Sequence, residues 1–141
     1  AIADYIIAEA KKAPVDYVEG WMQALRSIDR QKCDLDMLSD LVRIAENVGH
    51  ARYTREIVPV IIELVREGPH FEEVILWLLP KLEVPVESGD ELDLFSAYAR
   101  AASGLITSDD RIAKILKRRA QKDRNRSVRE IARKAYEGRY T

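Results

Sequence analysis

Apolar residues recur every three or four positions along most of this chain, and this spacing constrains its fold more than any other feature. In one segment they are Val18, Trp21, Leu25 and Ile28, which would share one face of a helix. Strict alternation of apolar and polar residues is absent, and the most β-branched run, REIVPVIIELV, holds Pro59 in its middle. Proline is rarely found inside a central strand. The sequence therefore predicts an all-α protein.

Start and stop signals divide this pattern into eight helical segments. Small polar or acidic residues are expected to cap helix starts, and they are Asp34, Thr54, Asp90, Ser108 and Ser127. Glu130 would complete a capping box with Ser127. Glycines are expected just after helix ends, at Gly49, Gly68, Gly104 and Gly138. Pro59 is expected near the first turn of its helix, and Pro80 is expected to kink or end the next one.

The eight helices pair in order into hairpins near 1–33, 34–69, 70–107 and 108–141, so successive hairpins begin about 33, 36 and 38 residues apart. A near-constant period in this range is typical of an α-hairpin solenoid, in which neighbouring hairpins bury each other's apolar faces. A length of 141 residues suits a single domain. The pattern predicts one helical-repeat domain over 1–141, and an irregular helical bundle is the alternative.

The stretch KDRNRSVREIARKAYEG, residues 122–138, is the clearest single motif. It resembles the second helix of a HEAT repeat, in which an Asp precedes a Val-Arg pair and small residues follow. The matching residues here are Asp123, Val128, Arg129, Ala132 and Ala135. The resemblance implies a right-handed HEAT/armadillo-like superhelix in which Asp123 and Arg129 form a structural ladder between repeats. The preceding hairpin departs from the motif, because Ser96 stands where the family has Arg.

The net charge of −1 hides a strong asymmetry along the chain. Residues 108–141 hold twelve Lys or Arg and five Asp or Glu, a net charge of +7, and the remainder carries −8. The residues predicted to contact a partner or phosphate groups are Lys114, Lys117, Arg118, Lys122, Arg126 and Arg133. Three interpretations stay open: a nucleic-acid contact, docking on an acidic protein or on the acidic half of a second copy, and a solvated cap of the last repeat.

Signals of catalysis or metal binding are weak. Cys33 and His50 lack any element that would hold them together, and His70 has no partner at a metal-ligand spacing. The carboxylate pairs Glu72–Glu73 and Asp109–Asp110 suit first helical turns, where they favour the helix dipole. We therefore predict no catalytic residue, metal or cofactor, although a catalytic helical-repeat enzyme is a third, less favoured class. Trp77 is expected in the core or as a surface anchor.

The overall composition bears on location and source. Apolar residues make up 47% and charged residues 33%, as in soluble globular proteins, and no apolar run is long enough to span a membrane. A single cysteine favours a reducing compartment, which predicts the cytoplasm. Few amides with many charges follow a thermophilic trend. Together these features predict a non-catalytic protein-binding scaffold, with a nucleic-acid-binding module that uses residues 108–141 as the alternative.

Overall fold

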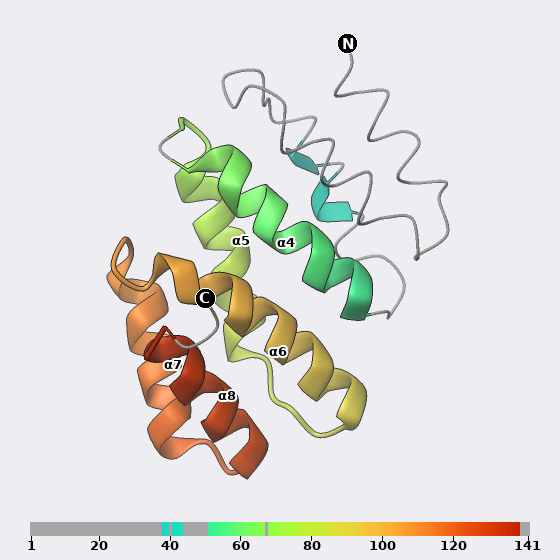
Figure 1. Ribbon diagram of the computed structural model, residues 1–141, viewed down its shortest axis with the longest axis vertical. Coiled ribbons are helices and arrows are strands. Elements are labelled where there is room, and N and C mark those ends of the chain that lie inside the picture. Colours follow the sequence, from blue (N-terminus) through green and yellow to red (C-terminus); the bar gives the residue numbers. More distant parts are fainter. Residues whose placement is uncertain (1–37, 40, 44–50, 67, 139–141) are drawn as a thin grey trace. The chain divides into compact units, whose positions relative to one another are not determined.

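The computed structural model describes residues 38, 39, 41–43, 51–66 and 68–138, and every regular element among them is a helix (Figure 1). The named elements are α4 (Ala51–Val65), α5 (Phe71–Glu83), α6 (Gly89–Ala102), the 3₁₀ helix η4 (Ser103–Leu105), α7 (Asp110–Lys122) and α8 (Arg126–Tyr136). The prediction of an all-α protein is confirmed for this part of the chain. The expected hairpin over residues 1–33, with Trp21 and Cys33, lies outside the described residues, and so does His50.

The chain divides into two compact units, Ala1–Val74 and Ile75–Thr141. In the first unit, α4 is buried almost all round, as its continuous apolar pattern predicts. Its fully or nearly fully buried side chains are Ile57, Val58, Val60, Ile61, Ile62, Leu64 and Val65. Nowhere in the described ranges is a helix long and apolar enough to cross a membrane.

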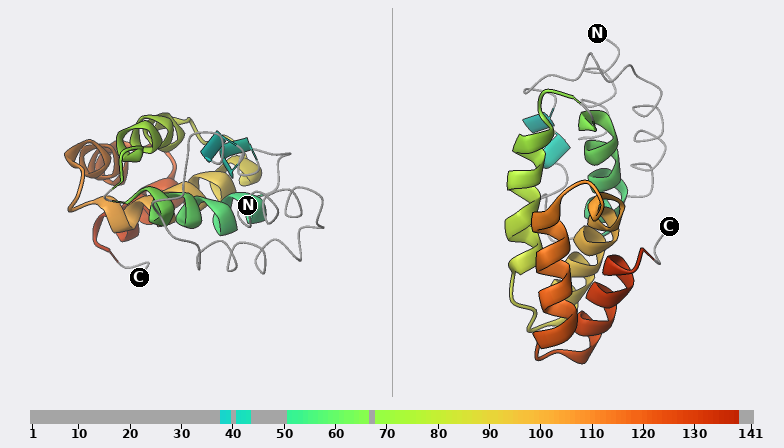
Figure 2. Two further views of the ribbon diagram at one scale, coloured as in Figure 1. Left: turned by 90° about the horizontal axis from the view of Figure 1, so that it is seen from above. Right: turned by 90° about the vertical axis from the view of Figure 1, so that its left-hand side faces the viewer.

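The second unit consists of two consecutive helical hairpins. Within it α5 lies beside α7 and α6 lies beside α8, so the four helices form two layers (Figure 2). A buried hydrogen bond of 2.8 Å from the Ser103 hydroxyl to the Ala135 carbonyl joins the end of α6 to α8. The unit therefore places like members of the two hairpins side by side.

The core of the second unit comes from the residues that helical spacing selects. The fully buried large side chains there are Ile75, Leu78, Leu82, Leu105, Ile112 and Leu116. Small residues on α6 and α8 let these two helices approach closely, and they are Ala99, Ala102, Ala132 and Ala135. Trp77 is half-buried and packs edge-on against Tyr98, with ring centroids 5.8 Å apart. Trp77 thus contacts the core.

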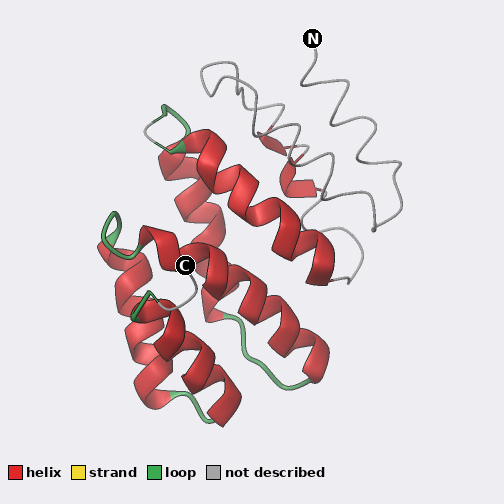
Figure 3. Ribbon diagram, viewed as in Figure 1, coloured by secondary structure: helices red, strands yellow, loops and turns green. Residues whose placement is uncertain are grey.

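Short connectors separate the helices of the second unit (Figure 3), and their caps differ from several of our predictions. Ser88, not Asp90, caps α6, and Glu91 accepts hydrogen bonds from the Ser88 hydroxyl and the Glu87 N–H. Ser88 and Glu91 therefore form a capping box at the start of α6. Asp90 falls in the first turn instead, where its charge favours the helix dipole.

Two further caps are displaced by one or two residues. Asp109, not Ser108, caps α7, and its carboxylate accepts a 2.9 Å hydrogen bond from the Arg111 N–H. Asn125, not Ser127, caps α8, and its side-chain oxygen accepts hydrogen bonds from the Ser127 and Val128 N–H groups. In both cases another residue type that favours the capping position lies within two residues of the predicted serine and takes its place. Gly138 ends α8 with a φ of 72°, as predicted.

Pro59 and Thr54 also depart from expectation, and Pro80 does not end its helix. α4 begins at Ala51, so Thr54 lies inside its first turn and is buried instead of capping the helix. Pro59 consequently falls in the helix interior, where the missing N–H removes one hydrogen bond of the helix. α5 continues past Pro80 to Glu83. The apolar side chains around each proline are buried, and this packing outweighs the local cost of the ring.

Candidate anion-binding face on the last hairpin

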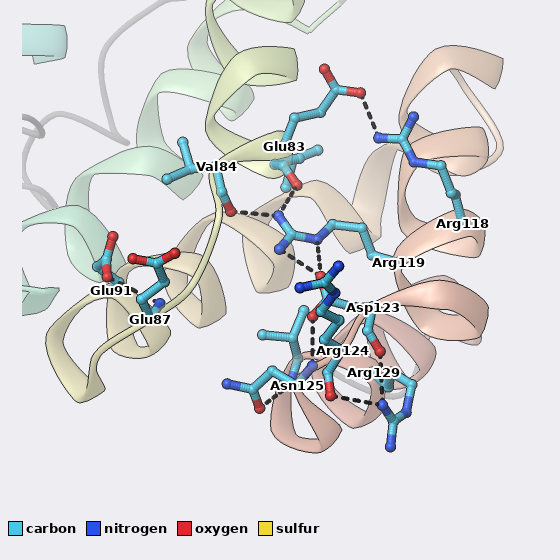
Figure 4. Close-up of polar contacts among 12 residues, drawn as sticks. Glu83, Val84, Glu87, Glu91, Arg118, Arg119, Asp123, Arg124, Asn125 and Arg129 are labelled. Atoms are coloured by element: carbon cyan, nitrogen blue, oxygen red, sulfur yellow. Dashed lines mark hydrogen bonds and ion pairs between the residues drawn. The ribbon is translucent and has the colours of Figure 1, made fainter.

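Arg119 is a buried residue of α7 that connects the last hairpin to the chain around the end of α5. Its side chain is only 7% exposed, and its guanidinium donates to the Leu82 carbonyl at 2.9 Å and to the Val84 carbonyl at 2.7 Å (Figure 4). It also forms an ion pair of 2.8 Å with the carboxylate of Asp123. One buried cation therefore links α7 to the chain that leaves α5.

The position of Arg119 follows from helical spacing. It lies three residues after Leu116 and seven after Ile112, so it belongs to the buried face of α7. Its guanidinium also lies over the Phe95 ring, 4.6 Å from the centroid, where the face of the ring attracts a cation. Counting the charges of residues 108–141 did not show this role, although the spacing of Arg119 from Ile112 and Leu116 could have revealed it.

Asp123 holds the turn between α7 and α8. Its carboxylate accepts hydrogen bonds from the Asn125 N–H at 2.9 Å and from the Arg119 guanidinium at 2.8 Å. Burial acts to raise the pKa of Asp123, but these hydrogen bonds and the positive charges of Arg119 and Arg129 outweigh it and hold the pKa below its ordinary value. Asp123 is therefore a charged structural group in the folded protein.

Arg129, in α8, forms hydrogen bonds with the same turn. Its Nη1 donates to the Asp123 carbonyl at 2.7 Å and to the Arg124 carbonyl at 3.1 Å. Both acceptors belong to the last hairpin itself. The hydrogen bonds to the carbonyls of Leu82 and Val84, at the end of α5 and just after it, come from Arg119. Asp123 lies in the turn between α7 and α8, and Arg129 lies in α8.

Three arginines of α8 border a shallow hollow on the surface of the last hairpin. The hollow measures about 280 Å³, and it is lined by Ala120, Arg126, Arg129, Glu130 and Arg133. The four charged residues lie at helical spacings of three, four and seven, which places them on one face of α8. Arg126 and Arg133 are exposed, and neither side chain has a hydrogen bond or ion pair with any residue the structure describes. We call this face, defined by Arg126, Arg129, Glu130 and Arg133, the arginine face.

The remaining residues predicted to contact a partner lie on α7 and are all exposed. Lys117 lies one turn before Ala120, on the side of α7 that borders the hollow. Arg118 instead reaches α5, where it pairs with Glu83 at 2.6 Å. Lys114 and Lys122 do not line the hollow. Of the six predicted residues, Arg126 and Arg133 therefore lie on the arginine face of α8, and the other four lie on α7.

The other candidates from the sequence have local structural positions. Nδ1 of His70 lies 3.3 Å from the Glu73 carboxylate, beside the first turn of α5, which also holds Glu72. Asp109 caps α7, and its hydrogen bond with the Arg111 side chain holds the pKa of Asp109 below its ordinary value. Within the described ranges, no group of three or more His, Cys, Asp or Glu residues could hold a metal ion.

Comparisons with protein-family models, with curated proteins and with solved structures gave no match to this chain.

Proposed function

We propose that this chain is a non-catalytic binding scaffold built from HEAT-like helical repeats that wind in a right-handed superhelix. The side-by-side packing of like helices in residues 75–141 supports this proposal, as does the motif at residues 123–135. The single cysteine of the chain favours a cytoplasmic location. In such a scaffold, rigid helices present a surface that loses little conformational entropy when a partner binds.

The partner in this proposal is an acidic polypeptide segment that binds along the arginine face. The observation that carries the proposal is the convergence of Arg126, Arg129 and Arg133 on one hollow. Guanidinium groups recognise carboxylates through paired hydrogen bonds, and arginines are common among the residues that dominate interface energies. Arg126 and Arg133 are available for such contacts because they have no partner among the described residues.

The start of α8 carries a positive charge that no acidic residue of its first turn offsets. Its first turn contains no acidic residue, and Arg126 occupies its first position. The N-terminus of a helix carries a partial positive charge, so arginines there lower the stability of the isolated helix. A bound anion would offset both the arginine charges and the helix dipole. Departures from local stability rules of this kind are expected at functional sites.

Glu130 favours a polypeptide over a nucleic acid as the partner. Its carboxylate lies among the three arginines, where it would repel each phosphate of a nucleic-acid backbone. A polypeptide backbone supplies N–H donors that a carboxylate can accept, and its acidic side chains can contact the arginines. The mixed character of the arginine face therefore fits an acidic peptide better than a continuous run of phosphates.

The proposal is tested by fluorescence anisotropy with a labelled peptide of alternating glutamate and glycine. The control peptide has glutamine in place of glutamate, and labelled single- and double-stranded oligonucleotides of similar charge are titrated in parallel. We expect the glutamate peptide to bind, the glutamine peptide not to bind, and the oligonucleotides to bind more weakly at near-physiological salt. Tighter binding of an oligonucleotide would instead support the nucleic-acid-binding alternative.

A second copy of the chain is another acidic partner to distinguish, because residues outside 108–141 carry a net charge of −8. Light scattering during size-exclusion chromatography distinguishes it. A dimer at low salt that dissociates as the salt is raised would assign the arginine face to self-association.

A further inference from the structure

We propose that the hollow on the arginine face is a receptor for one side-chain carboxylate of the partner, with Arg129 as its fixed anchor. This inference rests on the proposed function and adds to it a defined ligand group and a role for each residue. In this inference the hollow binds the carboxylate directly, whereas the lysines on α7 contribute only a diffuse positive charge.

Arg129 is held in place by the fold before any partner binds. Its Nη1 donates to the carbonyls of Asp123 and Arg124, and these bonds fix the guanidinium against the turn (Figure 4). A guanidinium has five N–H donors. The donors on Nε and Nη2 of Arg129 have no acceptor in the described part of the chain. These two nitrogens form one edge of the guanidinium, and such an edge suits a carboxylate bound through two parallel hydrogen bonds.

The turn that holds Arg129 is itself bonded to other parts of the unit. The Asp123 carbonyl that Arg129 contacts belongs to the residue whose carboxylate is bound to Arg119. Arg119 in turn is buried and bonded to the carbonyls of Leu82 and Val84. The anchor of the hollow is thus connected to the core of the unit, which reduces the ordering needed when a ligand binds.

The other charged residues of the hollow complete the receptor. Arg126 and Arg133 lie about one turn before and after Arg129, so both can reach a group bound at its edge. Glu130 is exposed and has no hydrogen-bond or ion-pair partner among the described residues. In this arrangement its carboxylate accepts the backbone N–H of the partner beside the bound acidic side chain.

Volume and charge both favour a carboxylate. A hollow of about 280 Å³ lies at the lower limit for small-molecule pockets and has room for one acidic side chain. Glu130 lies within the hollow, and its repulsion acts more strongly on the double charge of a phosphate than on a single carboxylate charge. The receptor is therefore assigned to Asp or Glu side chains in preference to phosphorylated ones.

The test compares two double variants that remove the same charge. Arg126→Gln with Arg133→Gln removes two cations from the hollow, and Lys114→Gln with Lys122→Gln removes two cations from the outer surface of α7. Binding of the labelled glutamate–glycine peptide to each is measured by anisotropy at near-physiological salt. We expect the first pair to weaken binding about tenfold or more and the second pair less than about threefold, because hydrogen-bonded charge pairs outweigh screened distant charges.

Arg129→Lys gives a second measurement, because lysine keeps the charge and removes the guanidinium edge. We expect it to weaken peptide binding about tenfold, with circular dichroism showing that the helix content is retained. If this variant unfolds, the matched double variants still decide the question.

Each alternative result has a distinct meaning. Equal weakening by the two double variants would overturn the receptor and leave the proposed function standing, whereas no binding by the wild-type chain would overturn both. A peptide with phosphoserine in place of one glutamate provides the last arm. If it binds the wild-type chain more than about tenfold tighter, the assignment to a carboxylate is wrong.

Discussion

A buried guanidinium joins consecutive hairpins of the second unit. Arg119 bonds two backbone carbonyls next to the end of α5 and the carboxylate of Asp123, and it is 7% exposed. The Leu82 carbonyl belongs to the last turn of α5, where helix carbonyls have no partner within the helix. Arg119 thus satisfies the Leu82 carbonyl, which would otherwise be buried without a hydrogen bond.

We predict that Arg119→Met lowers the free energy of unfolding by about 2–4 kcal/mol, because it leaves two carbonyls and a carboxylate without their partner. Urea denaturation followed by circular dichroism measures this change. Arg118→Met is the matched control, since its ion pair with Glu83 is about half exposed and exposed pairs contribute less than about 1 kcal/mol. Equal effects of the two substitutions would contradict the structural role of Arg119.

The lowered pKa of Asp123 predicts that the free energy of unfolding depends on pH. Its pKa in the folded protein lies below its ordinary value, so folding favours the ionised carboxylate. The resulting stabilisation is fully present above the ordinary aspartate pKa of about 3.9 and is lost as the pH falls through the lower pKa of the folded state. We expect the difference in unfolding free energy between the wild type and Asp123→Asn to be constant above about pH 5 and to shrink below about pH 4. Urea titrations at several pH values would show this, and a difference that grows on acidification would refute it.

The helices themselves were largely predictable from the sequence because apolar spacing selects their buried faces. Phe95, Tyr98, Ile112, Leu116 and Val128 all lie at this spacing and are buried. Helix starts were less predictable, since several residues near each start can accept the same backbone N–H groups. The backbone conformation decides which of them does, and a sequence pattern does not specify it.

The assignment of Asn125, and not Ser127, as the cap of α8 can be tested directly. We predict that Asn125→Ala lowers the free energy of unfolding by about 1 kcal/mol, because its side chain accepts two N–H groups of the first turn. Ser127→Ala should change it by less than about 0.5 kcal/mol, since Ser127 is exposed and does not occupy the cap. Thermal or urea denaturation of the two variants distinguishes them, and a larger effect at Ser127 would restore the original prediction.

At the scale of the whole molecule, the charge split of the chain was visible in the sequence but the arginine face was not. Counting charges placed +7 within residues 108–141 and could not tell which of them converge. The structure buries Arg119, pairs Arg118 with Glu83 and gathers three arginines around the hollow on α8. Arg126 and Arg133 belonged to the predicted set, whereas the part of Arg129 and Glu130 in the hollow emerged only from the packing of α7 against α8.

The binding of an acidic peptide to the arginine face is tested by mapping which arginines the peptide contacts. The side-chain Nε–H resonances of the ¹⁵N-labelled chain are followed by NMR during a titration with the glutamate–glycine peptide. We expect saturable shifts concentrated on Arg126, Arg129 and Arg133, with small shifts for the Nε–H of Arg111 and Arg118 on α7. Shifts centred on the arginines of α7, or no shifts at saturating peptide, would contradict the assignment of the arginine face as the binding surface.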